Sequence, residues 1–521
     1  MKMSKLSKNI TYEDELQASI ALGIEKVYRV AKAAYGPLAG NAFLEENYGD
    51  PTISRDGVTN VEKVYLEDAV ENMAARTLIQ ASRKSDKKVG DGTTAVTILS
   101  YHLYKEARKL ISSGENRMAV SKKLQEVATE VLGKIDAYVK DVDDSLLKSV
   151  AVVSAGDENI GEMISDIISE VGSDAGITVE DFAGVGIYNE IVDGFYWRRG
   201  FTNINLINDA SNLESNLSNV SIFLSDRSFK AAAEIYPVIE KMVGGLGKGK
   251  EVLFVGDFAD EVLAALVLNK INGVIIPTVV DVNTFGPMRT MFLDDLATVT
   301  GSVVLAQGTN PKDFHIDMLG GADKVIVNEF STTIMGGDGP AEDLNTRVTE
   351  LKAQLADADS PVTQNALRDR ISRLTGKIAI IRVGGATETE QGETKLRVRD
   401  AVCAVQAAVK GGVVPGGGVT LARIGATLSS FSDSYKEPFK QLVDNAGENA
   451  EAYIAKVLDS PDLWSGFNLR DNKGIVNLLD AGVLDPADVI REVVTNSASV
   501  VAKLITTTVA VTYTDRAEKH D

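Results

Sequence analysis

The spacing of apolar residues changes twice along this chain, and this change limits the fold more than any other feature. From Leu16 to Val30 the apolar residues recur at intervals of three and four, which is typical of an amphipathic helix. Helical patterns continue to about residue 139, and they dominate again after residue 397. Between residues 194 and 376, short β-branched runs alternate with helical segments. The chain therefore predicts a mostly helical domain that is interrupted in sequence by an α/β insertion.

The expected strands of this insertion are the runs at residues 220–224, 252–255, 274–277, 303–305 and 325–327. Because helical segments lie between them, we expect a largely parallel sheet. A helical hairpin is predicted from Asp343 to Leu374, with Pro361 near its turn. A further strand is expected at 378–383, before a long helix over 397–409.

The composition argues against several functions. The 521 residues include 54 Lys and Arg against 74 Asp and Glu, so the formal net charge is −20. Such a chain repels phosphate backbones, which argues against nucleic acid as a partner. Cys403 is the only cysteine, so an intrachain disulfide is excluded, and one thiol with three His offers few ligands for zinc. No apolar run approaches a membrane span and no secretory signal is recognisable, so we expect a cytoplasmic protein without a membrane partner.

Two glycine clusters are candidates for phosphate binding. Gly90-Asp91-Gly92-Thr93-Thr94 precedes an apolar helical run at 95–103. Glycines permit close backbone approach, and the N-terminus of a helix offers free N–H groups and a positive dipole end. Asp91 is a hard oxygen ligand suited to Mg²⁺. The motif lacks the spacings of a Walker A loop and of a dinucleotide fingerprint, and the alternative is an ordinary turn with a Thr cap.

The second cluster is Gly416-Gly417-Gly418, before Val419. Taken alone it is equally consistent with a loop. Asp400 lies in a helical stretch upstream of it, and an Asp on a helix is usually a solvated charge. Two Asp residues together with two glycine turns are nevertheless consistent with a magnesium–nucleotide site, which is the alternative to a plain loop and a solvated charge.

Motifs in a fixed order along the chain connect it to a known family. They include Tyr35-Gly36-Pro37, Pro51-Thr52-Ile53-Ser54-Arg55-Asp56-Gly57, Gly90-Asp91-Gly92-Thr93-Thr94, Gly176-Ile177-Thr178-Val179-Glu180-Asp181, Gly411-Gly412-Val413-Val414-Pro415-Gly416-Gly417-Gly418 and Leu484-Asp485-Pro486. From about residue 10 to about residue 515 the sequence resembles the group I chaperonins, the family of GroEL. The resemblance implies an α/β multidomain fold with a mostly helical, discontinuous equatorial domain, a small intermediate domain and an α/β apical domain. The implied segments are 1–137 and 411–521 (equatorial), 138–192 and 378–410 (intermediate), and 193–377 (apical).

The resemblance also implies a nucleotide site. Asp91 would bind Mg²⁺, Asp400 would position the attacking water, and Asp56 would orient charge near the γ-phosphate. The further residues that it places around ATP are Tyr35, Gly36, Pro37, Arg55, Gly92, Thr93, Thr94, Ala95, Ser154, Gly417, Asn468 and Asp485. Arg55 stands where the family usually has Lys, and Ala95 where it often has a third Thr. These departures alter possible phosphate contacts but leave both the metal ligand and the water-positioning Asp in place.

Two apolar helices of the α/β insertion are candidates for an exposed binding surface. The segment 262–268 is apolar at most positions, and a helix on a sheet buries only one stripe. The alternative is that these residues all belong to the core. By resemblance, the positions that contact client chains and a co-chaperonin are Phe201, Leu206, Tyr236, Ile239, Leu263, Val267 and Leu268.

The function implied is that of an ATP-dependent chaperonin subunit, which captures non-native polypeptides and encloses them in a ring cavity. The implied cofactors are ATP, Mg²⁺ and K⁺. The implied partners are non-native polypeptides, a GroES-like lid and further copies of the chain in a heptameric ring, single or double. The competing hypotheses are a metabolic kinase or ligase, a passive holdase, and a group II chaperonin with a built-in lid, for which residues 262–285 leave no room.

The chain is shorter than GroEL after Gly418. Residues 419–428 are followed almost at once by the segment at Glu437-Pro438, where GroEL has about three to four additional turns of helix. In GroEL that segment lies where the two rings meet, and an Arg–Glu pair there matches Lys440 and Asn449. The sequence therefore predicts that the pairing of two rings is weakened, rearranged or absent.

Overall fold

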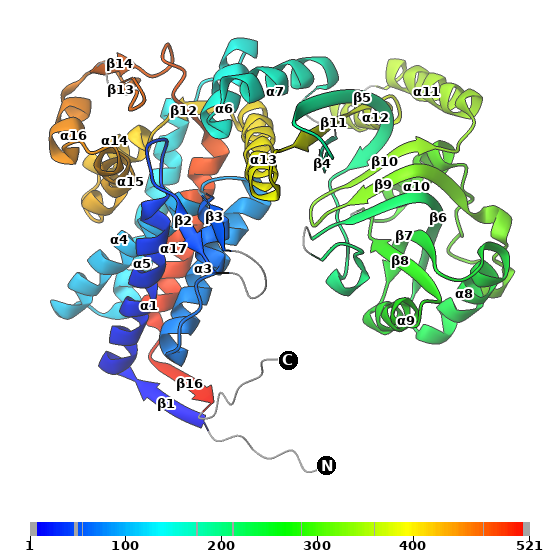
Figure 1. Ribbon diagram of the computed structural model, residues 1–521, viewed down its shortest axis with the longest axis horizontal. Coiled ribbons are helices and arrows are strands. Elements are labelled where there is room, and N and C mark those ends of the chain that lie inside the picture. The colour runs from blue at the N-terminus through cyan, green and yellow to red at the C-terminus, as the bar shows by residue number, and fades with distance from the viewer. Residues whose placement is uncertain are drawn as a thin grey trace. The chain divides into compact units, whose positions relative to one another are not determined.

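The computed structural model describes residues 8–45, 51–54, 56–172, 176–210, 213–282, 284–358, 360–471 and 474–513. The described residues form two compact units, and both are assembled from separate stretches of chain (Figure 1). Unit 1 comprises Met1–Ser169, Asp181–Gly186 and Val383–Asp521, and unit 2 comprises Glu170–Glu180 and Ile187–Arg382. A helical unit is thus interrupted in sequence by an α/β unit, as the change in periodicity predicted.

Unit 1 is mainly helical. Its N-terminal elements are β1 (Lys8–Tyr12), α1 (Glu13–Ala33), β2 (Ala42–Leu44), β3 (Thr52–Ser54), α2 (Gly57–Glu62), α3 (Ala69–Val89), α4 (Thr93–Ser112), α5 (Arg117–Ile135), the 3₁₀ helix η1 (Asp136–Tyr138), α6 (Asp144–Ala155) and α7 (Glu158–Val171). Its C-terminal elements are α13 (Glu388–Gly411), β12 (Val413–Pro415), α14 (Val419–Ala426), α15 (Ser432–Asn445), α16 (Ala450–Asp459), β13 (Ser465–Phe467), β14 (Ile475–Asn477), β15 (Leu484–Pro486), α17 (Ala487–Thr506) and β16 (Val509–Tyr513).

The main core of unit 1 surrounds α17. This helix packs against α3, α4 and α5, and Figure 1 shows it in red among the blue helices. Val493 and Val501 of α17 are fully buried together with Leu78 of α3 and Leu99 of α4. Because α17 is apolar on more than one face, it can be enclosed by neighbours from both ends of the chain. A smaller core joins α14, α15 and α16.

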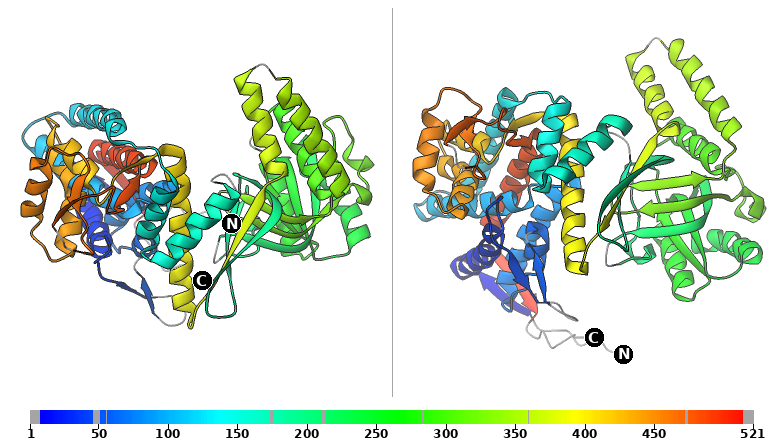
Figure 2. Two further views of the ribbon diagram at one scale, coloured as in Figure 1. Left: turned by 90° about the horizontal axis from the view of Figure 1, so that it is seen from above. Right: turned by 45° about the horizontal axis from the view of Figure 1, so that its top comes forward.

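Unit 2 is built on a sheet. Its elements are β4 (Ile177–Asp181), β5 (Gly186–Trp197), η2 (Ile204–Leu206), β6 (Ser215–Phe229), α8 (Ala232–Leu246), β7 (Lys250–Phe258), α9 (Asp260–Ile271), β8 (Ile275–Val280), α10 (Pro287–Thr300), η3 (Pro311–Asp313), η4 (Ile316–Met318), β9 (Gly320–Val327), β10 (Thr332–Gly337), α11 (Ala341–Ala356), α12 (Pro361–Leu374) and β11 (Lys377–Gly384). The eight-stranded sheet has the order β4-β11-β5-β10-β9-β6-β7-β8. Helices cover it on both faces, and α11 and α12 form the predicted hairpin (Figure 2).

The alternation of side chains along β6 explains the two cores of unit 2. Ile222 and Leu224 pack on one face with α10, α11 and α12, whereas Phe223 packs on the other with α8 and α9. Successive residues of a strand point to opposite faces of a sheet, so a strand that is apolar at every position can be buried on both sides.

The structure corrects two predictions about this sheet. Strand β6 pairs in parallel with β7, and β7 with β8, whereas β10 pairs antiparallel with β5 and with β9, and β9 pairs antiparallel with β6. The run at 303–305 is not a strand, because Val303 is exposed and Leu305 makes only an isolated bridge to Ser225. Of the helices in the described part of the chain, none combines the length and the apolar character needed to cross a lipid bilayer.

Candidate functional site

The first glycine cluster joins two long helices of unit 1. Gly90 ends α3 in the left-handed conformation, with φ 68°, and Gly92 precedes α4 with φ 82°. Gly92 is the N-cap of α4, and no side chain caps that helix. The predicted alternative of a Thr cap is therefore wrong. Gly92 has no side chain that could cap the first N–H groups of α4, and such a helix start favours an anion.

Asp56 and Gly57 lie against this helix terminus. The Asp56 carboxylate caps α2 and accepts hydrogen bonds from the N–H and the hydroxyl of Thr59 at 2.7 and 2.6 Å. A Cβ at Gly57 would lie only 1.9 Å from Oγ1 of Thr94 and 3.6 Å from Oγ1 of Thr93. The absence of a side chain at Gly57 thus lets the turn before α2 approach both threonines. Arg55, the neighbouring predicted phosphate contact, lies outside the described residues.

The second glycine cluster faces Asp485. Strand β12 pairs with β15 so that Val414 lies opposite Asp485. Gly417 and Gly418 follow β12 with φ 63° and 76°, and their N–H groups donate to the Asp485 carboxylate. Burial, followed by the charge of Asp91, raises the pKa of Asp485 to about 7 against the effect of these hydrogen bonds. The carboxylates of Asp485 and Asp91 are therefore close enough to repel each other.

Asp91 and Asp400 belong to one cluster of carboxylates. Burial raises the pKa of Asp91, and the charge of Asp56 raises it further, whereas the N–H of Gly92 lowers it. Burial also raises the pKa of Asp400 well above its usual range, and the carboxylates of Asp56, Asp91 and Asp86 add to this rise. Asp400 is thus not a solvated charge on α13, and the structure brings it together with Asp56 and Asp91.

Asp86 is a member of the cluster that the sequence alone did not reveal. Burial raises its pKa to about 6, with a contribution from Asp56, whereas Arg399 lowers it. Its backbone carbonyl accepts the N–H of Gly90 at 2.7 Å, so it lies one helical turn before the glycine cluster. That spacing from Asp91 was the available signal. Within the described residues, Arg399 is the side chain whose positive charge lowers the pKa of both Asp86 and Asp400.

The Tyr35-Gly36-Pro37 turn lies beside the same carboxylates. Burial and the charges of Asp485 and Asp91 raise the pKa of the Tyr35 hydroxyl. Gly36 has φ 96°, which favours glycine, and Pro37 is exposed. This turn, the two glycine clusters and the carboxylates therefore belong to one region of unit 1.

The remaining predicted contacts have other surroundings. Ala95 packs against the core of unit 1, and Thr93 is buried. Asn468 is engaged within its own loop, where its side chain donates to Asp471 and accepts from the N–H of Arg470. Ser154 is half-buried near the end of α6. The structure thus brings together the residues predicted to bind the phosphates, but not those predicted to bind the base.

Cys403 lies near the cluster but has no reactive character. Burial, followed by the charge of Asp400, raises the pKa of its thiol to about 12. A Cβ at Gly90 would lie 2.1 Å from the Cβ of Cys403, so α13 packs closely on the first glycine turn. A thiol that stays protonated at neutral pH is a poor nucleophile and a poor metal ligand.

The carboxylate cluster could hold a divalent cation only if a bound phosphate supplied further oxygen ligands. Among the described residues, no group of three or more His, Cys, Asp and Glu is arranged to hold a metal ion by itself. The carboxylates nevertheless raise one another's pKa, so a cation near them would relieve their repulsion. Mg²⁺ is commonly held by one or two carboxylates together with phosphate oxygens, and the uncapped terminus of α4 suits a phosphate.

The predicted client positions of unit 2 divide into buried and exposed residues. Tyr236 of α8 and Leu268 of α9 are exposed, at 48% and 58%. The expectation of exposure is wrong for Leu206, Ile239 and Leu263, which belong to the core beneath α8 and α9. The reason is geometric, because these three residues lie on the faces of their elements that meet the sheet. Phe201 and Val267 are partly buried against the cores.

Two exposed apolar residues of the same region were not predicted. Ile204 of η2 and Ile271 at the end of α9 are exposed, the latter at 73%. The Nζ of Lys270 donates to the carbonyl oxygens of Asn205 and Ile207, which ties η2 to α9. Ile204, Leu268 and Ile271 therefore belong to neighbouring elements.

Comparison with solved structures shows a chaperonin fold. Over 96% of this chain and 98% of the other, the structure matches the chaperonin gp146 from the bacteriophage EL 2 (Pseudomonas aeruginosa), crystallised in the presence of ATP-BeFx, with a TM-score of 0.69 and 18% sequence identity. A second crystal form of that protein matches over the same shares with a TM-score of 0.59.

The family follows from the sequence itself. Residues 27–511 match the model of the TCP-1/cpn60 chaperonin family. The chain belongs to this family, which confirms the recognition based on its ordered motifs. The chain is a group I chaperonin, and in the described residues between α9 and α10, which contain β8, the structure has no built-in lid.

Proposed function

We propose that this chain is the subunit of an ATP-dependent chaperonin that captures non-native polypeptides and encloses them for folding, driven by binding and hydrolysis of Mg-ATP. The observation that carries the proposal is the position of Asp91 and Asp400. Both belong to a cluster of mutually repelling carboxylates around Asp56 and Asp86, next to the uncapped N-terminus of α4. Buried carboxylates that repel one another cost free energy, and a bound magnesium–phosphate ligand would offset this repulsion.

Each part of the site has a proposed task. Gly92, Thr93 and Thr94 bind phosphate oxygens through N–H and hydroxyl groups at the start of α4. Asp91 holds Mg²⁺, which when bound supplies positive charge to the phosphate oxygens. Asp400 orients water and accepts its proton, a task that suits a carboxylate whose pKa is raised well above its usual range by burial.

The glycine turn and Asp485 complete the nucleotide side. The N–H groups of Gly417 and Gly418 hold the Asp485 carboxylate, which fixes the turn after β12. Tyr35, Gly36 and Pro37 form a second wall. Asn468 and Ser154 are proposed for the base side on the resemblance alone.

The client surface is proposed on α8, α9 and η2. Tyr236 and Leu268 are exposed on two helices that pack against each other, and Ile204 and Ile271 extend this apolar surface. Exposed apolar residues from adjoining elements are typical of a site that binds other proteins. Non-native chains and a GroES-like lid are the proposed partners.

Self-assembly has support from two small sheets of unit 1. Strands β1 and β16 form a two-stranded sheet that exposes Ile10, Val511 and Tyr513, and the β2–β3 sheet exposes Phe43 and Ile53. Two-stranded sheets with apolar side chains and unpaired edges readily pair with another chain. We therefore propose a homo-oligomeric ring, with seven subunits, K⁺ dependence, the division into equatorial, intermediate and apical segments and a cytoplasmic location taken from the resemblance.

The test is the ATPase rate of the purified protein with and without a chemically unfolded polypeptide, together with electron microscopy with and without ATP. A chaperonin gives ring-shaped particles and hydrolysis that responds to the unfolded chain. Hydrolysis that ignores unfolded protein but requires a small metabolite would contradict the proposal in favour of a metabolic kinase. Client binding without any ATP turnover would leave a passive holdase.

A further inference from the structure

Helix α15 lies against two glycine turns of the candidate nucleotide site. A Cβ at Gly36 would lie 2.3 Å from Cδ2 of Leu442, and a Cβ at Gly418 would lie 2.8 Å from the backbone N of Phe439. A side chain at Gly418 would therefore clash with the backbone of α15, and one at Gly36 would displace the end of the Leu442 side chain. The position of α15 therefore limits where each turn can run.

Asn445, the last residue of α15, holds the chain directly before Gly36. Its Nδ2 donates to the carbonyl oxygens of Lys32 and Tyr35, both at 2.7 Å. Lys32 lies in the last turn of α1, where its carbonyl also accepts the N–H of Tyr35 at 3.3 Å, and Tyr35 follows two residues after the helix ends. Because Tyr35 lies beside Asp485 and Asp91, Asn445 fixes the backbone at the edge of the carboxylate cluster.

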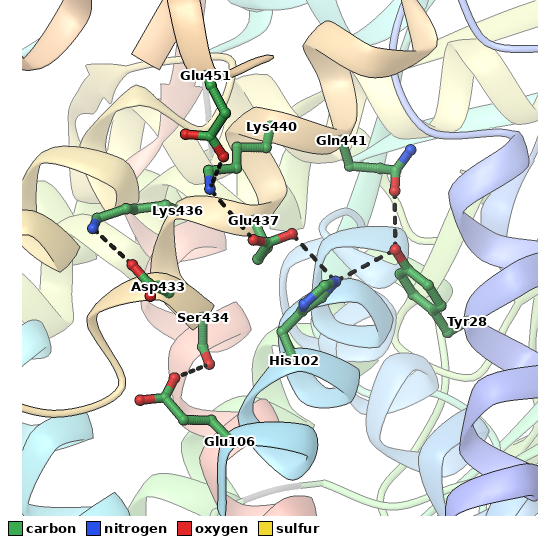
Figure 3. A network of polar contacts seen from close by, with 10 residues as sticks. All are labelled: Tyr28, His102, Glu106, Asp433, Ser434, Lys436, Glu437, Lys440, Gln441 and Glu451. Carbon is green, nitrogen blue, oxygen red and sulfur yellow. Dashed lines mark hydrogen bonds and ion pairs between the residues drawn. The ribbon is translucent and has the colours of Figure 1, made fainter. Parts of the chain in front are cut away.

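A chain of polar contacts orients Asn445. Nε2 of Gln441 donates to Oδ1 of Asn445 at 2.9 Å, and the hydroxyl of Tyr28 donates to Oε1 of Gln441 at 3.0 Å. Nε2 of His102 lies 3.3 Å from the same hydroxyl and 3.5 Å from the carboxylate of Glu437 (Figure 3). Both polar atoms of the Asn445 amide therefore have partners, which come from the last turn of α1, from Tyr35 just beyond it and from α15 itself.

The far end of this chain of contacts reaches α16. Nζ of Lys440 lies 3.7 Å from Glu437 and 2.6 Å from Glu451 (Figure 3). On the other side of His102, the ring of Tyr28 stacks on that of Tyr101, with centroids 4.0 Å apart. Helices α1, α4, α15 and α16 are thus joined around one histidine, which keeps α15 in a single position relative to the end of α1.

We propose that Asn445 is a positioning residue for the nucleotide, because it holds the Tyr35–Pro37 turn in the geometry that binds the ligand. Gln441, Tyr28 and His102 keep the Asn445 amide in the orientation that reaches both carbonyls. The inference rests on the proposed nucleotide site, but the contacts that carry it are independent of that proposal.

The deciding variant is Asn445→Asp, which preserves the size of the side chain and replaces the Nδ2 donor with a carboxylate that repels both carbonyl oxygens. We expect Mg-ADP to bind about tenfold more weakly in calorimetry, because two partly buried hydrogen bonds that hold the turn are lost. The rate at saturating ATP should change much less, because Asp400 and Asp91 are untouched. Hydrogen exchange of the amides at residues 34–40 should become faster, while the exchange within α4 stays at the parent rate.

The matched control is Asn116→Asp. Asn116 is the exposed N-cap of α5, and Asp caps a helix as well as Asn does, so the same change in charge occurs away from the turn. It should bind Mg-ADP as the parent does. A second variant, Tyr28→Phe, removes only the hydroxyl at the middle of the contact chain and should weaken binding by about threefold.

The outcomes separate the two proposals. Faster exchange at 34–40 with weaker Mg-ADP binding supports the positioning role. Unchanged exchange in Asn445→Asp, or faster exchange with unchanged binding, overturns it. If the parent protein binds no Mg-ADP, the proposed function fails, while the exchange measurement still decides whether Asn445 holds the turn.

Discussion

Asp485 shows how the candidate site depends on its own protonation. Its carboxylate accepts the N–H groups of Gly417 and Gly418, yet burial and Asp91 raise its pKa to about 7. The value in an unfolded chain is about 3.9. At a pH between these two pKa values, Asp485 binds more protons in the folded protein than in the unfolded chain. The free energy of unfolding therefore falls progressively as the pH rises from about 4 to about 7.

Replacement of this carboxylate should therefore stabilise the protein more at high pH than at low pH. Asp485→Asn keeps an oxygen for the glycine N–H groups and removes the charge. In chelator and without nucleotide, we expect its melting temperature to exceed that of the parent at pH 8, to exceed it by less at pH 5, and to match it below about pH 4. Asp480→Asn, an exposed position nearby, is the control and should change none of these values. Equal effects of Asp485→Asn at all three pH values would contradict a raised pKa.

Asp91 and Asp400 should separate binding from hydrolysis. Asp400→Ala removes a group proposed to orient water and accept its proton, so binding of Mg-ATP should stay within about twofold of the parent while hydrolysis slows about a hundredfold or more. Asp91→Ala removes the proposed metal ligand and should weaken binding itself. Calorimetry with Mg-ATP and a phosphate-release assay measure the two quantities. Hydrolysis at the parent rate by Asp400→Ala would show that the assigned role is wrong.

Individual site residues were predictable where they belong to an ordered motif. Asp56, Asp91, Asp400 and Asp485 were all named from the sequence, and the structure brings them together. Asp86 was missed because its one signal in the sequence, its spacing from Asp91, does not show which way a charged residue on a helix faces. Its neighbours come from distant segments, which only the folded chain reveals.

At the scale of elements, the sequence indicated which segments are helices but not how each one is turned. The segment 262–268 is apolar almost all round, so its exposed side could not be chosen from periodicity alone. The structure buries Leu263 and exposes Leu268. The direction of strands was equally hidden. The hairpin of β9 and β10 is antiparallel, and Asn328, whose side chain accepts the N–H groups of Phe330 and Ser331, was its local signal.

The two faces of α9 give a test of client binding. Leu268→Ser changes an exposed residue, so melting should stay close to the parent while suppression of aggregation by the protein falls. Tyr236→Ser on α8 should behave in the same way. Leu263→Ser, by contrast, removes a buried side chain and should cost about 2–5 kcal/mol of stability. Full capture of an unfolded protein by the Leu268→Ser/Tyr236→Ser double variant would place the client surface elsewhere.

The helical hairpin of α11 and α12 is joined to α10 by a buried ion cluster. Asp295 is 3% exposed, and its carboxylate accepts hydrogen bonds from Arg347 of α11 at 3.1 Å and from Nε and an Nη of Arg370 of α12 at 2.7 Å. Removal of one member of a buried ion cluster leaves its partners without compensation. The loss of Asp295 alone should therefore destabilise the protein, because it leaves the buried charges of Arg347 and Arg370 unpaired, even if the ion cluster as a whole contributes little net stability.

Asp295→Ala should consequently destabilise unit 2 by about 3–5 kcal/mol. Its neighbour Asp294 is exposed, so Asp294→Ala is the matched control and should cost less than about 1 kcal/mol. Denaturant unfolding measures the difference, and hydrogen exchange should place it in α11 and α12. A loss as small as that of the control would mean that water replaces the carboxylate without penalty.

At the scale of the whole molecule, the sequence was most informative about chain organisation. The two changes in periodicity predicted a helical unit split around an α/β unit, and the structure has this division. The pattern could be read because each unit buries its own core, so the repeat of apolar residues reports the local type of structure. Contacts between copies of the chain leave no such repeat, because a surface residue is free to be polar or apolar.

The segment between α14 and α15 bears on whether two rings of this chain can associate. Residues 427–431 connect these helices directly, with Leu428 and Phe431 buried, so the additional helix that GroEL carries here has no counterpart. Lys440 is paired within its own chain with Glu437 and Glu451, and the side chain of Asn449 caps α16. Neither residue is thus left to form a salt bridge with a second ring.

We expect that two rings of this chaperonin associate weakly or not at all. An exposed salt bridge contributes at most about 1 kcal/mol, so the missing helix matters more than the missing pair. Analytical ultracentrifugation without nucleotide, over a range of protein concentrations, should show single rings that persist on dilution and any double rings only at the highest concentrations. Lys440→Arg with Asn449→Glu restores the charges found in GroEL without the helix, and it should leave the distribution almost unchanged. A fourteen-subunit particle that remains intact at nanomolar concentration would show instead that residues 427–435 make a ring contact of their own.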